Sequence, residues 1–218
     1  MKLRDKLLIS LGFLCLMGFA LINFFSIQQL KTHHKPEYDK YTYAYDCLKE
    51  AEIAYWDYKS ALVNEVQNYI TSVAPNSNLR GYAIVEECEI HNIDICFVLA
   101  QGEIESHFGT KGIASKLNCV FNVGIYDNKT SEEIESKFKF TCPNESIGPY
   151  LNLLNKRYLV NKVEQDLMAE FVDINGNRYA SDVDYELKIS SKYKFIIENT
   201  KINEYFTMMK SWANKCNR

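Results

Sequence analysis

The most constraining feature of the sequence is residues 97–109, an apolar stretch that contains two glutamates. At about 3.6 residues per turn, Gln101 and Glu105 share one helical face with the apolar residues Phe97, Val98, Ile104 and Phe108. Such a face points into a core or a cleft floor. Desolvation there should raise the pKa of Glu105, whereas Glu103 should lie on the solvated side. A protonated carboxyl suits general-acid catalysis. The alternative is a glutamate that reaches water or pairs with a lysine.

Length and composition restrict the class of protein. The 218 residues have room for one domain with a sizeable core and an extension. Nearly half are hydrophobic and few are Gly or Pro, which is typical of a globular chain. A net charge of −3 without a basic cluster excludes nucleic acid as a partner. No CxxC or HxxxH occurs, so neither a zinc site nor another cofactor is expected.

The N-terminus reads as a membrane segment. Three basic residues precede an apolar run from Leu7 to about Ile27, and about 20 apolar residues suffice to cross a bilayer. We expect a single-pass anchor at 1–30, a linker at 31–40 and a domain at 41–218. The basic start predicts a cytoplasmic N-terminus and an extracytoplasmic domain, where disulfides persist and the pairing of six cysteines stays open. A cleaved signal peptide, and hence a secreted protein, is the competing interpretation.

The remaining sequence predicts a mainly helical α+β domain. Apolar residues recur at three- and four-residue steps from 41 to 73. Further helices are expected at 79–91, from 94 through the central stretch, and at 144–155, 163–171, 183–198 and 202–212. Residues 119–141 contain more β-branched and aromatic side chains around a polar turn, which predicts a small hairpin or two-stranded lobe.

Four motifs between residues 92 and 185 carry a family resemblance. Residues 92–109, NIDICFVLAQGEIESHFG, resemble the helix GIPASITLAQALLESGWG of the bacterial and phage endo-β-N-acetylglucosaminidases, which are peptidoglycan hydrolases of the flagellar-rod and autolysin types. Residues 118–127, NCVFNVGIYD, are similar to the family's Asn-rich segment. The ESI at 145–147 with Arg157 and Tyr158 resembles a third motif, and YASDVDY at 179–185 resembles the family's YATDPNY.

The resemblance implies a lysozyme-like fold, an α-rich domain with a small β-lobe beside the cleft. It implies that Glu105 is the catalytic acid, that Tyr158 lines the cleft and that Phe121 belongs to its floor. A purely structural role for Tyr158 is the alternative, and Tyr179 and Tyr185 are expected to pack the last helices. Further candidates for substrate binding are Gln101, Asn118 and Asp127.

Two departures from the family pattern matter. His107 stands where the family has a glycine. The second carboxylate has no clean match: Glu135 is the first candidate, followed by Glu133 and Asp127, and each is equally well explained as a solvated charge. A carboxyl pair about 6.5–9.5 Å apart would fit inversion through water; without one, the substrate's acetamido group could assist.

The apolar N-terminus predicts a membrane anchor, and the resemblance implies a hydrolase, bacterial or phage, that cleaves peptidoglycan strands at the β-1,4 bond after N-acetylglucosamine. A lytic transglycosylase or muramidase of the same fold is one alternative. A catalytically inactive wall-binding or assembly module is the other. Retention of Glu105 on an apolar face argues against the inactive module, because a buried carboxyl without a role costs stability.

Overall fold

The computed structural model describes residues 42, 44–122 and 139–216 of the protein. The chain divides into two compact units, Met1–Glu52 and Ile53–Arg218. In the described part of the first unit, residues 44–52 are helical. The second unit contains all the elements that position the candidate site.

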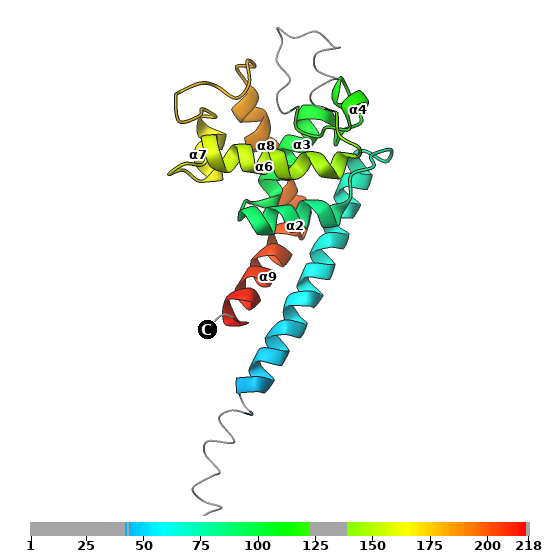
Figure 1. The fold of residues 1–218 in the computed structure, drawn as a ribbon, viewed down its shortest axis with the longest axis vertical. Helices are drawn as coiled ribbons and strands as arrows, with labels where there is room; N and C mark the ends of the chain where they lie inside the picture. The colour runs from blue at the N-terminus through cyan, green and yellow to red at the C-terminus, as the bar shows by residue number, and fades with distance from the viewer. Residues whose placement is uncertain (1–41, 43, 123–138, 217–218) are drawn as a thin grey trace, which may run out of the picture. The chain divides into compact units, whose positions relative to one another are not determined.

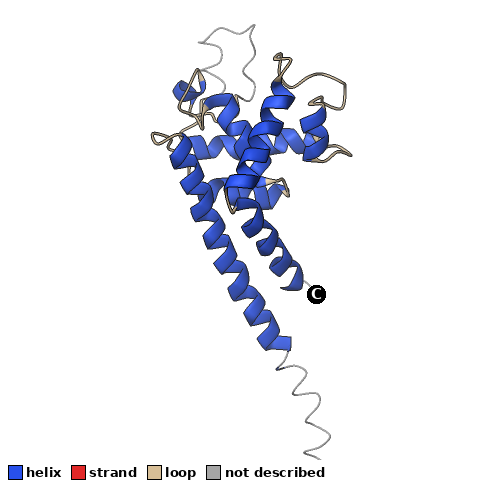
Figure 2. Cartoon of the chain, turned by 180° about the vertical axis from the view of Figure 1, so that it is seen from behind, coloured by secondary structure: helices blue, strands red, loops and turns tan. Residues whose placement is uncertain are grey.

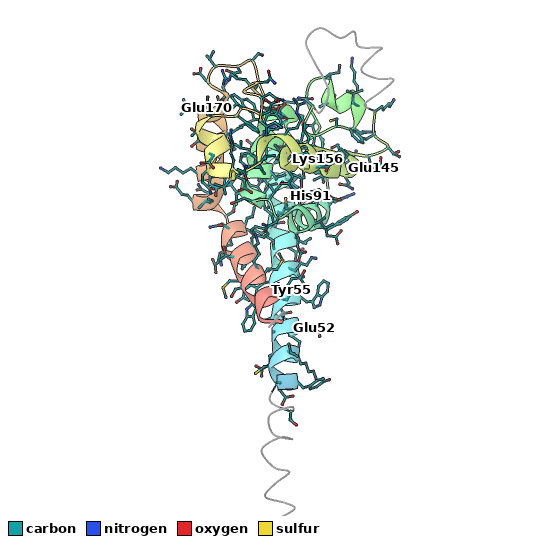
Figure 3. The ribbon with its side chains drawn as sticks, turned by 60° about the vertical axis from the view of Figure 1, so that its left-hand side comes forward. Glu52, Tyr55, His91, Glu145, Lys156 and Glu170 are labelled. Carbon is teal, nitrogen blue, oxygen red and sulfur yellow. The ribbon has the colours of Figure 1, made fainter. Side chains whose placement is uncertain are left out.

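A long helix begins the second unit. Residues 53–73 are helical and lead through a turn to α2, Gly81–His91. Tyr55, labelled in Figure 3, donates a hydrogen bond to the Glu89 carboxylate on α2. At the first residue of α2, a Cβ on Gly81 would lie 2.7 Å from a backbone oxygen of the long helix. The two helices therefore approach so closely at this point that only glycine fits without a shift of the backbone.

The central element is α3, Ile95–Ser106, which is enclosed by its neighbours. Its start is capped by Asp94, whose carboxylate accepts hydrogen bonds from the N–H groups of Cys96 (2.7 Å) and Phe97 (3.2 Å), amides that have no partner within the helix. Every residue from Ile95 to Gly102 is buried. The prediction of one buried face was therefore too narrow: α2, α8 and α9 all pack against α3.

Short helices follow α3, and two longer helices end the chain (Figure 1). They are α4 (Ala114–Leu117), the 3-10 turn η1 (Pro143–Ser146), α6 (Ile147–Leu153), the π-helical turn η2 (Leu154–Tyr158), α7 (Glu164–Ala169), α8 (Tyr185–Asn199) and α9 (Ile202–Cys216). Helix α8 packs along α3 and also contacts α7 and α9. This packing brings the first turn of α8 beside the last turns of α3.

The prediction of an α+β fold is wrong for the residues that the structure describes. Within them the architecture is helical, without a named strand (Figure 2), and one isolated antiparallel bridge joins Val172 to Arg178. Most of the predicted hairpin, residues 123–138, lies outside the described ranges. Next to the described ends of the segment, Phe140 N donates a backbone hydrogen bond to Leu117 O (2.9 Å). The neighbouring apolar residues are buried in the core instead of pairing as strands.

The predicted transmembrane helix also has no support. Across 42, 44–122 and 139–216, no helix combines the length and the apolar character needed to span a bilayer. The proposed span from Leu7 to Ile27, and the linker after it, lie outside the described residues.

Two buried thiols contribute to the core. Cys88 on α2 and Cys96 on α3 are free cysteines that are almost completely inaccessible to solvent. Burial is the main cause that raises the pKa of both thiols. They pack as small apolar side chains and are poor nucleophiles.

Candidate active site

Glu105 lies in the last turn of α3, where two side chains from other segments bind its carboxyl group. Tyr185, the first residue of α8, donates its hydroxyl to Oε1. Asn122 donates its Nδ2 to Oε2 at 3.0 Å and to the main-chain oxygen of Glu105 at 2.9 Å. Both carboxyl oxygens are thus held in place by neutral donors.

The electrostatic environment favours the protonated form of Glu105. Burial is the largest cause and raises the pKa of the carboxyl above its usual range, while the hydrogen bonds from Tyr185 and Asn122 offset this only in part. No cation forms an ion pair with Glu105 among the described residues. A carboxyl group in this setting holds its proton to a higher pH than an exposed glutamate does.

Tyr185 is itself held in position. Gln101, one helical turn before Glu105, donates its Nε2 to the Tyr185 hydroxyl at 3.1 Å. Burial is the main cause that raises the pKa of Tyr185, and the nearby Glu105 adds to the effect. The phenol therefore stays protonated and acts as a donor, so a chain of hydrogen bonds runs from Gln101 through Tyr185 to Glu105.

Aromatic rings surround this chain. Tyr179 stacks on Tyr185, with ring centroids 5.6 Å apart, and on Phe171, with centroids 4.5 Å apart. Tyr158 meets the Phe171 and Tyr179 rings edge-on. The low polarity of these rings explains the desolvation of Glu105.

A tight turn presents Tyr179 to the cluster. The Asp173 carboxylate accepts hydrogen bonds from the backbone N–H groups of Asn175 and Asn177 and pairs with Arg157 at 2.5 Å. These hydrogen bonds hold residues 174–176 as a turn, with Asp173 as its anchor. Beyond the turn, Tyr179 donates its hydroxyl to the main-chain oxygen of Phe121 at 3.1 Å.

Three buried polar atoms near Glu105 have no hydrogen-bond partner among the described residues: Gln101 Oε1, Asn122 Oδ1 and the Tyr150 hydroxyl. Gln101 and Asn122 belong to the chain of hydrogen bonds that holds Glu105. A buried acceptor without a partner is costly. Gln101 Oε1 and Asn122 Oδ1 are therefore acceptors with unused hydrogen-bonding capacity close to Glu105.

The predicted site residues lie at different places in the structure. Glu105 and Gln101 lie one helical turn apart on α3, and both bind the Tyr185 hydroxyl. Phe121 is buried and stacks on Tyr150 with centroids 3.9 Å apart, and Tyr158 is 8% exposed behind Tyr179. The Asn118 amide binds the main-chain oxygens of residues 140 and 141.

Three of the predicted site residues lie outside the described ranges: Asp127, Glu133 and Glu135. The ESI motif has a structural contact: the Glu145 carboxylate, labelled in Figure 3, accepts a hydrogen bond from Thr141 N at 2.9 Å. This contact fastens the start of η1 to the segment before it.

Sequence reasoning missed two contacts of the acid. Tyr185 was assigned to packing, yet its hydroxyl binds Glu105, and Asn122 was not singled out. Glu103 was expected on the solvated side, but it pairs with Lys192 at 2.6 Å and accepts a hydrogen bond from Tyr69. The motif that contains Asn122 and the tyrosine that closes the last motif were the available signals.

No cluster of three or more His, Cys, Asp or Glu residues suited to a metal ion is found in the described part of the chain. The groups gathered around Glu105 are one carboxyl, two amides and phenols. Their chemistry is proton donation and hydrogen bonding.

Comparison with known proteins identifies a family. The family model described as mannosyl-glycoprotein endo-beta-N-acetylglucosaminidase matches residues 81–198, more than half of the chain. The matched region contains Glu105, Asn122, Tyr179 and Tyr185. No curated protein matches the sequence. The match supports a glycosidase of the type that acts on peptidoglycan.

Proposed function

The chain belongs to the endo-β-N-acetylglucosaminidase family, and we propose that it hydrolyses the β-1,4 glycosidic bond after N-acetylglucosamine in peptidoglycan, with Glu105 as the general acid. The observation that carries this proposal is the state of Glu105. Its carboxyl is desolvated, has a raised pKa and is bound only by neutral donors.

The proposed role of Glu105 is to protonate the departing glycosidic oxygen while the bond to the anomeric carbon breaks. The carboxylate that results is stabilised by Tyr185 and Asn122, whose hydrogen bonds to Oε1 and Oε2 strengthen once the oxygens are charged. Gln101 keeps the Tyr185 hydroxyl aimed at Oε1. The same contacts that hold the acid therefore favour its reacted form.

Two routes complete the reaction. In the first, a second carboxylate activates water on the opposite face of the sugar, and Glu135 is the first candidate, followed by Glu133 and Asp127. In the second, the acetamido oxygen of the substrate attacks the anomeric carbon as the glycosidic bond breaks, and water then attacks that carbon and opens the ring that was formed. Asn122 Oδ1 supports the second route, because this buried acceptor has no partner among the described residues and an acetamido N–H is a suitable donor.

The substrate places the proposed activity outside the cytoplasm, where peptidoglycan lies. An extracytoplasmic location of the catalytic domain is part of the proposal. Fractionation of cells with an antibody against the domain tests it.

Muropeptide analysis tests the proposed reaction. Purified peptidoglycan is digested with the full-length protein, with Glu105→Gln and with Glu103→Gln, a matched control two residues earlier on α3. We expect new reducing ends of N-acetylglucosamine from the wild type and from Glu103→Gln. Loss of general-acid catalysis should slow Glu105→Gln by about 10²–10⁴-fold. Anhydro ends would assign the protein to the transglycosylases, reducing muramic ends would assign it to the muramidases, and no cleavage would favour the wall-binding module.

A further inference from the structure

A cavity of about 500 Å³ opens at the C-terminal end of α3. Its walls come from residues 73–78 after the long helix, from the segment between His107 and Asn118, and from Pro143. Glu105 does not line it, although His107 follows Glu105 by only two residues. A cavity of this size holds a small ligand.

The charge of the lining selects the class of ligand. Lys111 lines the cavity, and none of the lining residues that the structure describes is Asp or Glu. The Lys111 ammonium forms no ion pair with any described residue. The chain as a whole is acidic, with a net charge of −3. A cationic hollow without acidic side chains attracts an anionic group.

The backbone at this end of α3 does not cancel that charge. Terminal helix carbonyls repel anions when they are exposed, but here they are capped: His107 N and Phe108 N donate to Glu103 O and Gly102 O at 2.9 Å each, and Ser106 O accepts from the amides of the following turn. The lining residues whose side chains can donate to a ligand include Lys111, His107, Asn76 and Asn78.

The lining also argues against a second sugar site. Pyranose rings bind by stacking their apolar faces on aromatic rings, which supply large flat apolar surfaces. None of the described residues that line the cavity is Phe, Tyr or Trp, in contrast to the aromatic cluster around Glu105. Amides and an ammonium group suit the carbonyls and carboxylates of a peptide.

We propose that this cavity binds the acidic stem peptide of peptidoglycan, with Lys111 paired to a peptide carboxylate and Asn76 and Asn78 bonded to peptide groups. The inference rests on the proposed function, because the stem peptide is part of the peptidoglycan substrate that the proposed function assigns to the protein. The cavity would then direct cleavage toward strands that carry peptides.

Titration of the full-length protein with a synthetic stem peptide that lacks glycan tests the inference, with binding followed by calorimetry. Lys111→Gln should weaken binding about fivefold, which corresponds to the loss of one partly exposed ion pair. Lys116→Gln is the matched control: Lys116 is also exposed in the same segment but does not line the cavity, so binding should be unchanged. Neither change touches the core.

Two results would overturn the inference: equal binding by the wild type and Lys111→Gln, or displacement of the peptide by inorganic phosphate at equal concentration. The first removes the role of Lys111, and the second reduces the cavity to a general anion site. Peptide binding is measured without cleavage, so it separates the two proposals. A protein that binds the peptide through Lys111 but cleaves no glycan supports this inference and refutes the proposed function.

Discussion

Replacement of Tyr185 by Phe removes one hydroxyl from the site and changes the acid in a defined direction. That hydroxyl donates to Glu105 Oε1 and lowers the pKa of the carboxyl against the larger effect of burial. Without it, the pKa of Glu105 rises further. A general acid works in its protonated form, so activity falls as the pH rises through its pKa. In Tyr185→Phe the alkaline limb of the activity profile should therefore move to higher pH.

The size of the changes in carboxylate stabilisation and in protein stability follows from the two hydrogen bonds that the Tyr185 hydroxyl makes. A hydrogen bond to a charged oxygen contributes about 1.5–3 kcal/mol, and the ionised carboxylate would be without this stabilisation. The substitution also leaves the buried Gln101 Nε2 without its acceptor, at a cost of about 1–3 kcal/mol in the free energy of unfolding. We expect a lower rate at the optimum as well, because Oε1 is no longer held in one orientation.

The assay is kcat/KM for a soluble glycan substrate across the pH range, together with urea unfolding of each variant. Tyr179→Phe is the matched control, since its hydroxyl donates to the Phe121 main-chain oxygen and not to Glu105. Its alkaline limb should coincide with that of the wild type. An unmoved or acid-shifted limb in Tyr185→Phe, or an equal shift in Tyr179→Phe, would refute the reasoning.

Three further predictions concern stability and are measured by urea unfolding. His107 has φ 53° at the C-cap of α3, a conformation that costs a non-glycine residue about 1–2 kcal/mol; His107→Gly should stabilise the protein by about 1 kcal/mol, and a loss of stability would contradict this. Gly81→Ala should destabilise it by about 1–3 kcal/mol, because the added Cβ would lie 2.7 Å from a backbone oxygen; wild-type stability would show that the helices separate freely. Burial opposes ionisation of Asp173, but hydrogen bonds from Asn177, Asn175 and Arg157 lower its pKa to about 2, so the carboxylate stabilises the fold above its usual pKa and this contribution is lost as the pH falls toward 2. Asp173→Asn should therefore be less stable than the wild type at pH 7, with a gap that closes toward pH 2; a gap independent of pH would exclude the linkage.

Helices were predictable because their signals are local. The periodic pattern at 41–73 agrees with helical residues at 44–73, and the predicted segment at 202–212 lies within α9. The central stretch was predicted as a helix but with the wrong environment. A helix enclosed by several neighbours has little periodicity, so its burial depends on partners such as α8 that are distant in sequence.

At the described ends of residues 119–141, strands were predicted wrongly because the prediction used composition and not pairing partners. Val120 and Phe121 have the β-branched and aromatic character of strand residues, but in the structure they fill the core. Whether such residues pair or pack is decided by tertiary contacts. The family resemblance was correct because four ordered motifs carry more information than local composition.

In the candidate site, the position of Glu105 could be predicted and its partners could not. The apolar face indicated a desolvated carboxyl, and burial does raise its pKa. Its two hydrogen-bond donors lie 17 and 80 residues away in sequence, a separation at which no periodicity operates. Glu103 shows the same limit, since its partners Tyr69 and Lys192 come from other helices.

The most direct test of the central claim compares two leaving groups in the wild type and Glu105→Gln. In a dinitrophenyl glycoside of an N-acetylglucosamine oligomer, the leaving group is dinitrophenolate, which departs without protonation. In the natural glycan, the leaving group is the hydroxyl oxygen of the next sugar, which requires an acid. If Glu105 is the general acid, Glu105→Gln should lose about 10²–10⁴-fold in kcat/KM on the natural glycan and far less on the dinitrophenyl substrate. An equal loss on both substrates would contradict the assignment of Glu105 as the acid.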